Sequence, residues 1–232
     1  MKALLQTGGF KWDWDYTFEI LPSMAEAVVV TIQLTALGFA LALIIGLFLA
    51  LARRSKNKLI SWPAVSVVEF VRSTPLVVQL FFIFYVLPRI PIIGVALDPF
   101  VTAVLALGIH FGSYTSEVYR AGIEAVDNGQ WNVARALNFS PMKTWTNIIL
   151  PQAIPPMIPA LGNYLIGMFK ETPQVSVVTV TELFRRADIF GKTEFRYLEP
   201  MTMVGVFFFL LSYPSALLVQ RLEARYARRK QT

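Results

Sequence analysis

Few side chains in this sequence could carry out catalytic chemistry. The chain has no cysteine and a single histidine, His110. A structural zinc site needs about four cysteine or histidine ligands, so none can be built here. A cysteine nucleophile is excluded, and a serine–histidine–aspartate triad would have to use His110, which stands inside an apolar run. No nucleophile–base pair is legible, so the sequence predicts neither an enzyme nor a bound cofactor or metal.

The chemically notable residues are instead charges inside or beside long apolar stretches. Glu69 and Arg72 are three positions apart on one helical face, and Lys170 and Glu171 follow another apolar stretch. An intramembrane charge is costly and is a functional hypothesis by default. A carboxylate and an ammonium together could receive the two ends of a zwitterion. The alternatives stay open: Glu69 and Arg72 could pair with each other, and Lys170 could anchor the helix at the interface.

Five stretches are long and apolar enough to cross a bilayer, which takes about 20 mostly apolar residues. Hydrophobic residues make up 55% of the 232 residues and charged residues only 16%, whereas about a quarter of an ordinary soluble domain is charged. We predict an all-α integral membrane protein with transmembrane helices at 24–52, 61–88, 99–126, 144–170 and 198–222. The net charge of +6 is small and scattered, which does not favour nucleic-acid binding.

Basic residues near the span ends predict the orientation of the chain. They follow the first span (Arg53, Arg54, Lys56 and Lys58) and fill the C-terminal tail (Arg221, Arg225, Arg228, Arg229 and Lys230). We therefore expect an external N-terminus and a cytosolic C-terminus. Residues 1–22 would be an external interfacial segment, 23–225 a single transmembrane domain, and 226–232 a basic cytosolic tail.

The cytosolic loop at 127–143 has the sequence of two short helices separated by a tight turn. Asp127 can cap the first helix, and Asn138 tolerates the left-handed conformation that ends one. Ser140 and Pro141 then restart a helix as a cap followed by proline at the first helical position. Such a projection offers a knob to a soluble partner.

Two features of the predicted spans have both a structural and a functional interpretation. The fourth span contains four prolines (Pro151, Pro155, Pro156 and Pro159), so we expect a broken helix that lines a cavity, or a kink that only shapes the bundle. His110 lies between Gly108 and Gly112, a spacing that lets helices approach closely. A packing histidine is favoured there over a proton relay.

Residues 129–151 resemble the EAA loop of ABC importer permeases, which reads Glu-Ala-Ala, three residues, Gly, nine residues and Ile-x-Leu-Pro. The loop matches at Ala134, Ile148, Leu150 and Pro151, and it departs at Asn132, Val133 and Asn138, where the family has Glu, Ala and Gly. Further segments are similar to the polar amino acid subgroup, at 31–35, 69–79, 113–120, 150–153, 161–163, 170–172 and 182–183. The resemblance therefore covers most of the chain.

The resemblance implies a type I ABC importer permease fold in the bacterial inner membrane, without ATPase activity of its own. It implies two ATPase subunits bound through the loop, a solute-binding protein outside, and a second permease subunit, with a paralogue favoured over a second copy. The solutes of the subgroup are polar amino acids (His, Glu, Gln, Arg), opines, or zwitterions such as ectoine and hydroxyectoine.

The resemblance also assigns two groups of residues. ATPase coupling falls to Gly129, Trp131, Asn132, Ala134, Arg135, Leu137 and Asn138, and a solute pathway to Glu69, Arg72, Thr74, Gln79, Lys170, Glu171 and Thr172. We expect Trp131, Ala134 and Leu137 to pack into a groove on the ATPase, as an amphipathic helix does. We expect Arg135 to pair with carboxylates there. Glu117 and Arg120 are expected to form a structural ion pair.

The main alternative is a stand-alone secondary transporter for small zwitterions. Such transporters often contain internal repeats, and this sequence shows no convincing repeat of 20 to 50 residues. Gly191, Lys192 and Thr193 resemble the end of a phosphate loop, but that motif needs a glycine five residues earlier, where Arg186 stands. Energy from ATP would therefore have to come from a separate subunit.

Overall fold

The computed structural model describes residues 11–92 and 94–229, and all regular structure in those ranges is helical. The α-helices are α1 (Trp14–Arg53), α2 (Lys58–Arg72), α3 (Leu76–Phe81), α4 (Pro99–Glu124), α5 (Asn128–Ala136), α6 (Pro141–Thr144), α7 (Leu150–Glu171), α8 (Leu183–Thr193) and α9 (Leu198–Arg229). Segments of π or 3-10 geometry join them at η2 (Phe82–Val86), η3 (Leu87–Arg89), η4 (Trp145–Ile149) and η5 (Thr172–Val178). The predicted all-α fold is confirmed for the described residues.

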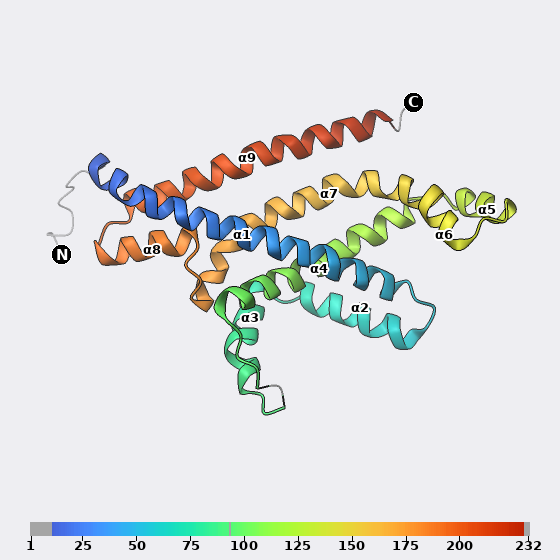
Figure 1. Cartoon of the computed structure of the whole chain (residues 1–232), viewed down its shortest axis with the longest axis horizontal. Coiled ribbons are helices and arrows are strands. Elements are labelled where there is room, and N and C mark those ends of the chain that lie inside the picture. Colours follow the sequence, from blue (N-terminus) through green and yellow to red (C-terminus); the bar gives the residue numbers. More distant parts are fainter. Residues whose placement is uncertain (1–10, 93, 230–232) are drawn as a thin grey trace, which may run out of the picture.

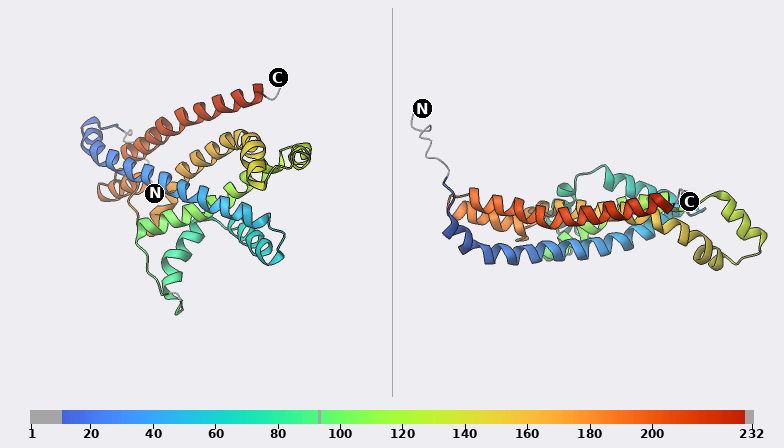
Figure 2. Two further views of the ribbon diagram at one scale, coloured as in Figure 1. Left: turned by 45° about the vertical axis from the view of Figure 1, so that its right-hand side comes forward. Right: turned by 90° about the horizontal axis from the view of Figure 1, so that it is seen from above.

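Helices α1 and α4 lie side by side and form the most extensive helix–helix contact of the fold (Figure 1; Figure 2). Glycines make this close approach possible. A Cβ atom at Gly46 would overlap Thr115 Oγ1 and would lie 2.9 Å from Gly112 O. A Cβ at Gly108 would meet the side chain of Leu41. The close packing predicted for Gly108 and Gly112 is confirmed.

The predicted span at 61–88 is not one straight helix. Helix α2 and the segment Leu76–Arg89 are bent by 108° at a short break. The break contains Thr74 and Pro75, and Pro75 has extended backbone angles that cap α3 without a side-chain hydrogen bond. Proline cannot donate a backbone hydrogen bond and disfavours helical geometry in the residue before it. We call this break the elbow.

Gln79 satisfies the carbonyl groups that the elbow frees. Its side-chain Nε2 donates to Val71 O at 2.8 Å, to Thr74 O at 3.1 Å and to Thr74 Oγ1 at 2.9 Å. Its Oε1 lies 3.2 Å from His110 Nδ1 on α4. Within a bilayer no water can donate a hydrogen bond to such carbonyls, so a side chain has to donate instead. The hydrogen bond to Gln79 agrees with a packing role for His110.

The break expected in the fourth span is absent from the described structure. Helix α7 is continuous from Leu150 to Glu171 although Pro155, Pro156 and Pro159 lie inside it. The irregularity lies one turn earlier, in the π-helical η4 just before Pro151. The Gln152 side chain donates to Ile148 O at 2.7 Å there. Helix α7 therefore remains one continuous element although each of these prolines lacks a backbone donor.

Helices cover all five predicted spans, but fewer of these helices are long and apolar enough to qualify as membrane-crossing. Two described helices are long and apolar enough to cross a membrane, Trp14–Arg53 and Leu198–Ala224, and the bent pair Lys58–Arg72 and Leu76–Arg89 makes up to three. Helices α4 and α7 coincide with the spans at 99–126 and 144–170. Five crossings therefore stay a prediction. The prediction for residues 1–22 lies partly outside the described residues, and the prediction for 226–232 lies wholly outside the residues whose side chains are described.

We expect Gly46→Ala to destabilise the protein by about 1–3 kcal/mol, the usual range for overpacking a tight contact. The new methyl group would overlap Thr115 Oγ1 and force α1 away from α4. Gly205→Ala is the matched control, because a Cβ at Gly205 would meet no atom within 4 Å. Thermal unfolding of the purified variants in detergent measures the difference. Equal Tm values for the two variants would contradict the packing argument.

Candidate functional site

A small knob formed by α5, a tight turn and α6 projects beyond the long helices (Figure 1). The Asp127 carboxylate caps α5 by accepting from Gly129 N at 2.7 Å. Asn138 has a φ of 54°, and Phe139 N donates to Ala134 O at 3.0 Å, which closes the helix end. Ser140 Oγ accepts from Lys143 N at the start of α6. The predicted caps of both short helices are therefore confirmed.

One side of the knob faces inward. Ala134 is 1% exposed, and Trp131 is partly buried against a cluster formed by the end of α4 and the start of α7. The Trp131 ring meets the Trp145 ring edge to face, with centroids 5.4 Å apart and planes at 85°. Two of the residues predicted to enter an ATPase groove thus pack within this chain. Sequence analysis did not single out Trp145, because it lies fourteen positions from Trp131 along the chain.

The other side of the knob presents apolar side chains to the outside. Leu137 is 60% exposed and Met142 73% exposed, with Val133 and Phe139 also exposed. We call these four residues the knob tip. Sequence reasoning identified only Leu137, although Val133 lies one helical turn before it. Asn132, Arg135 and Asn138 are exposed beside the tip, and Arg135 donates to Asn132 Oδ1 at 2.8 Å.

A carboxylate on α4 collects three arginines where α1, α2 and α4 meet. Glu117 lies 2.6 Å from Arg53, 2.8 Å from Arg120 and 3.4 Å from Arg72. The predicted Glu117–Arg120 pair is confirmed. No ion pair joins Glu69 to Arg72 among the described residues, and Glu69 is exposed. Arg72 instead lies over the Tyr114 ring at 5.5 Å. Spacing in the sequence could not reveal Arg53, which is far from Glu117 along the chain.

The two segments predicted to line a solute pathway, 69–79 and 170–172, lead into elements that pack against each other. Helix α3, which follows the elbow, packs against η5, which begins at Thr172. In η2, which continues α3, Tyr85 Oη donates to Val177 O of η5 at 3.2 Å. Thr172 is buried and donates to Phe169 O. Glu171 is half-buried, Lys170 is exposed, and no ion pair joins them among the described residues.

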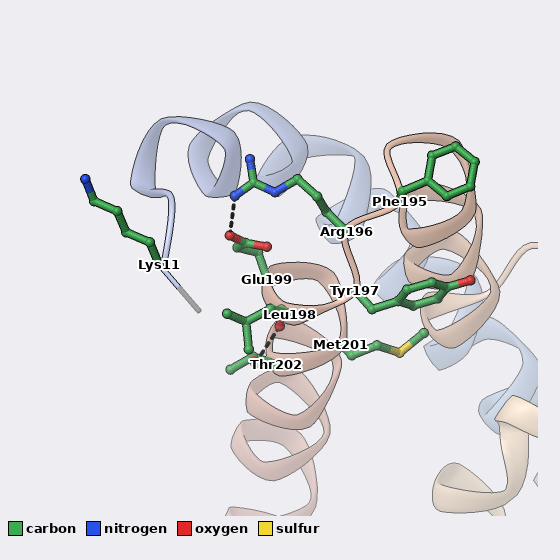
Figure 3. Close-up of a pocket in the computed structure, with 8 residues that line it drawn as sticks. All are labelled: Lys11, Phe195, Arg196, Tyr197, Leu198, Glu199, Met201 and Thr202. Atoms are coloured by element: carbon green, nitrogen blue, oxygen red, sulfur yellow. Dashed lines mark hydrogen bonds and ion pairs between the residues drawn. The ribbon is translucent and has the colours of Figure 1, made fainter. Parts of the chain in front are cut away.

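The opposite end of the molecule carries an ionic cluster between α1 and the α8–α9 turn (Figure 3). Arg196 lies 3.1 Å from Asp13 and 2.6 Å from the buried Glu199, and its guanidinium covers the Tyr16 ring at 4.9 Å. The backbone N–H of Tyr16 and then Arg196 hold the pKa of Asp13 below its ordinary value. Beside the cluster is an open pocket of about 680 Å³. The cluster fixes the first turn of α1 to α9.

No group of three or more histidine, cysteine, aspartate or glutamate side chains suited to a metal ion occurs among the described residues. Among the described residues, charged groups gather around Glu117, around Arg196 and at the end of α7.

Comparison with known proteins gives a consistent result. Residues 42–228 match the family model described as binding-protein-dependent transport system inner membrane component. The chain is 42% identical to the "Probable amino-acid ABC transporter permease protein y4tG" of Sinorhizobium fredii, over 95% of this chain and 96% of that protein. It is 32% identical to the glutamine transport system permease protein GlnP of Escherichia coli K12, over 93% and 98%.

A solved structure agrees with these relatives. The crystal structure of an amino acid ABC transporter with histidines has a TM-score of 0.85 and 35% identity, and the match covers 93% of this chain and all of that one. The inward-facing MetNI methionine ABC transporter, at 16% identity and a TM-score of 0.63, shares the fold. The chain belongs to the binding-protein-dependent transport system inner membrane component family and is a permease subunit of an ATP-binding cassette importer.

Proposed function

We propose that this permease subunit moves a polar amino acid or related zwitterion across the bacterial inner membrane, driven by a separate ATPase that docks on the knob. The exposed apolar knob tip carries the proposal. Leu137 and Met142 are exposed on the knob, whose helices α5 and α6 lie beyond the ends of the long helices (Figure 1). Apolar patches exposed to water mark interaction sites. A short amphipathic helix that lies in a groove is a common mode of docking.

The assembly that we propose is built on docking of an ATPase at the knob tip. We infer two ATPase subunits, one on the knob of each of two permease subunits, and a solute-binding protein on the far side. The second permease subunit is proposed to be a paralogue. The basic loop between α1 and α2, the end of α9 and the knob lie toward the same end of the molecule (Figure 1). This supports an orientation with the N-terminus outside and the C-terminus in the cytosol.

The proposed solute class is supported by the relatives and by the charges near the elbow. Relatives are named for glutamine and, in Bacillus subtilis, L-cystine, both zwitterions. The Arg72 contact to Glu117 is the longest of the three at that carboxylate, and Arg72 is partly exposed. It is therefore the arginine most available to a solute carboxylate. We propose Glu171 for the solute ammonium, and an ectoine-type solute is a narrower form of the same proposal.

We expect ATP-dependent accumulation when this chain is reconstituted with its partner permease, its ATPase and its solute-binding protein in proteoliposomes. Labelled glutamine, histidine, arginine and ectoine would be offered with and without ATP inside. Accumulation that needs ATP and favours one solute supports the proposal and names the solute. Uptake that ignores ATP and follows an ion gradient would instead establish a secondary transporter.

We expect the double variant Leu137→Asp, Met142→Asp to reduce the ATPase recovered with the permease by at least about tenfold. Each carboxylate would have to lose water on entering an apolar groove, which costs several kcal/mol unless it is paired. The matched control is Leu59→Asp, since Leu59 is 85% exposed at the start of α2, away from the knob. Co-purification measures the loss. Full recovery of ATPase with the double variant would contradict docking at the knob tip.

We expect Glu171→Gln to raise the KM of uptake about tenfold or more, because the neutral amide cannot balance a solute ammonium group. The ATPase should still co-purify in full. Glu26→Gln is the control, since Glu26 is an exposed carboxylate on α1. Initial uptake rates across a solute concentration series give the KM. An unchanged KM in both variants would remove Glu171 from the solute pathway.

A further inference from the structure

Helix α5 is fixed to the base of α7 by two side-chain contacts. The Trp131 ring packs edge to face on Trp145, the first residue of η4. About two turns farther along the chain, Gln152 Nε2 lies 3.4 Å from Gln130 Oε1. The principal packing partner of α5 among the described elements is η4. The knob is therefore packed against η4 and the start of α7 as well as against the end of α4, from which the chain reaches α5.

Helix α7 connects this fixed point to the predicted solute pathway. It runs without interruption for 22 residues and ends at Glu171. At about 1.5 Å per residue this is roughly 33 Å, enough to span the hydrocarbon core of a bilayer. A displacement of its base therefore moves its far end as well. The π-turn η4 lies at the join between knob and helix, and such turns concentrate at functional positions.

We propose that Trp131 and Trp145 form a strut that transmits movement of the docked ATPase to α7, so that Trp131 is a positioning residue. This inference rests on the proposed function and assigns Trp131 a role distinct from the ATPase contact. Trp131 faces inward, whereas the knob tip faces outward. Without the strut, α5 keeps its Asp127 cap and its exposed apolar tip. The ATPase would bind and hydrolyse ATP, but the movement would no longer reach α7.

The test compares solute transported per ATP hydrolysed in proteoliposomes that contain the complete transporter. We expect Trp131→Ala and Trp145→Ala each to lower this ratio at least tenfold, with ATPase co-purification within twofold of the unsubstituted complex. The double variant should be no worse than either single variant, because the two rings act as one contact. Trp131→Phe keeps an aromatic edge and should restore at least half of the ratio. Trp62→Ala is the control, since Trp62 is 67% exposed on α2.

A second measurement restores the tie between α5 and α7 by a covalent link. The chain has no cysteine, so Gln130→Cys and Gln152→Cys can be joined by a short thiol-reactive cross-linker. In the Trp131→Ala background the cross-link should raise the coupling ratio at least fivefold, because it restores the tie between α5 and α7. No gain after complete cross-linking would overturn the strut.

Failure of the inference and failure of the proposed function have different signatures. An unsubstituted complex that does not import solute with ATP overturns both. A normal complex with a normal Trp131→Ala ratio overturns the strut alone. Loss of ATPase co-purification in Trp131→Ala, in step with lost uptake, also overturns the strut, because Trp131 would then be needed for docking itself.

Discussion

The close contact between α1 and α4 is the constraint on which the other positions depend. Glycines at 46, 108 and 112 let the two backbones approach, and Thr115 Oγ1 donates to Ala42 O at 2.9 Å across the contact. In a bilayer, lipid is as apolar as the side chains, so helix association depends on packing and hydrogen bonds between helices. Helix α4 then presents His110 to the elbow and Glu117 to three arginines. Moving α4 away from α1 would misplace both groups.

The second constraint is the need to satisfy backbone polar groups without water. The elbow and the proline-rich helix meet it differently. At the elbow the chain turns sharply, and a side chain eight residues from Val71 donates to the freed carbonyls. In α7 the prolines lie within regular helix, and the departure from α-helical geometry is concentrated in η4. At the elbow the helix direction changes by 108°, whereas α7 stays one continuous helix.

Local sequence signals predicted local structure well. Asp127, Asn138 and Ser140 each act where their side-chain chemistry indicated, because a cap depends on atoms only a few residues apart. The charge partners were harder to predict. Glu69 and Arg72 share a helical face, yet Arg72 reaches Glu117 on another helix. The four prolines of the fourth span predicted either a break or a kink, and the helix is not broken. Contacts between distant segments, such as Arg53 with Glu117, depend on the assembled fold.

The two-sided construction of the knob follows from its size. Helix α5 has nine residues, and helices shorter than about 12–15 residues are marginal in water without tertiary packing. One face of α5 must therefore pack against the rest of the chain, and Trp131 and Ala134 form that face. What remains for a partner is the opposite face, where Leu137 is exposed. The residues that stabilise the helix thus also fix its orientation. A surface fixed in this way can pass a displacement to α7, whereas a freely hinged helix would absorb it.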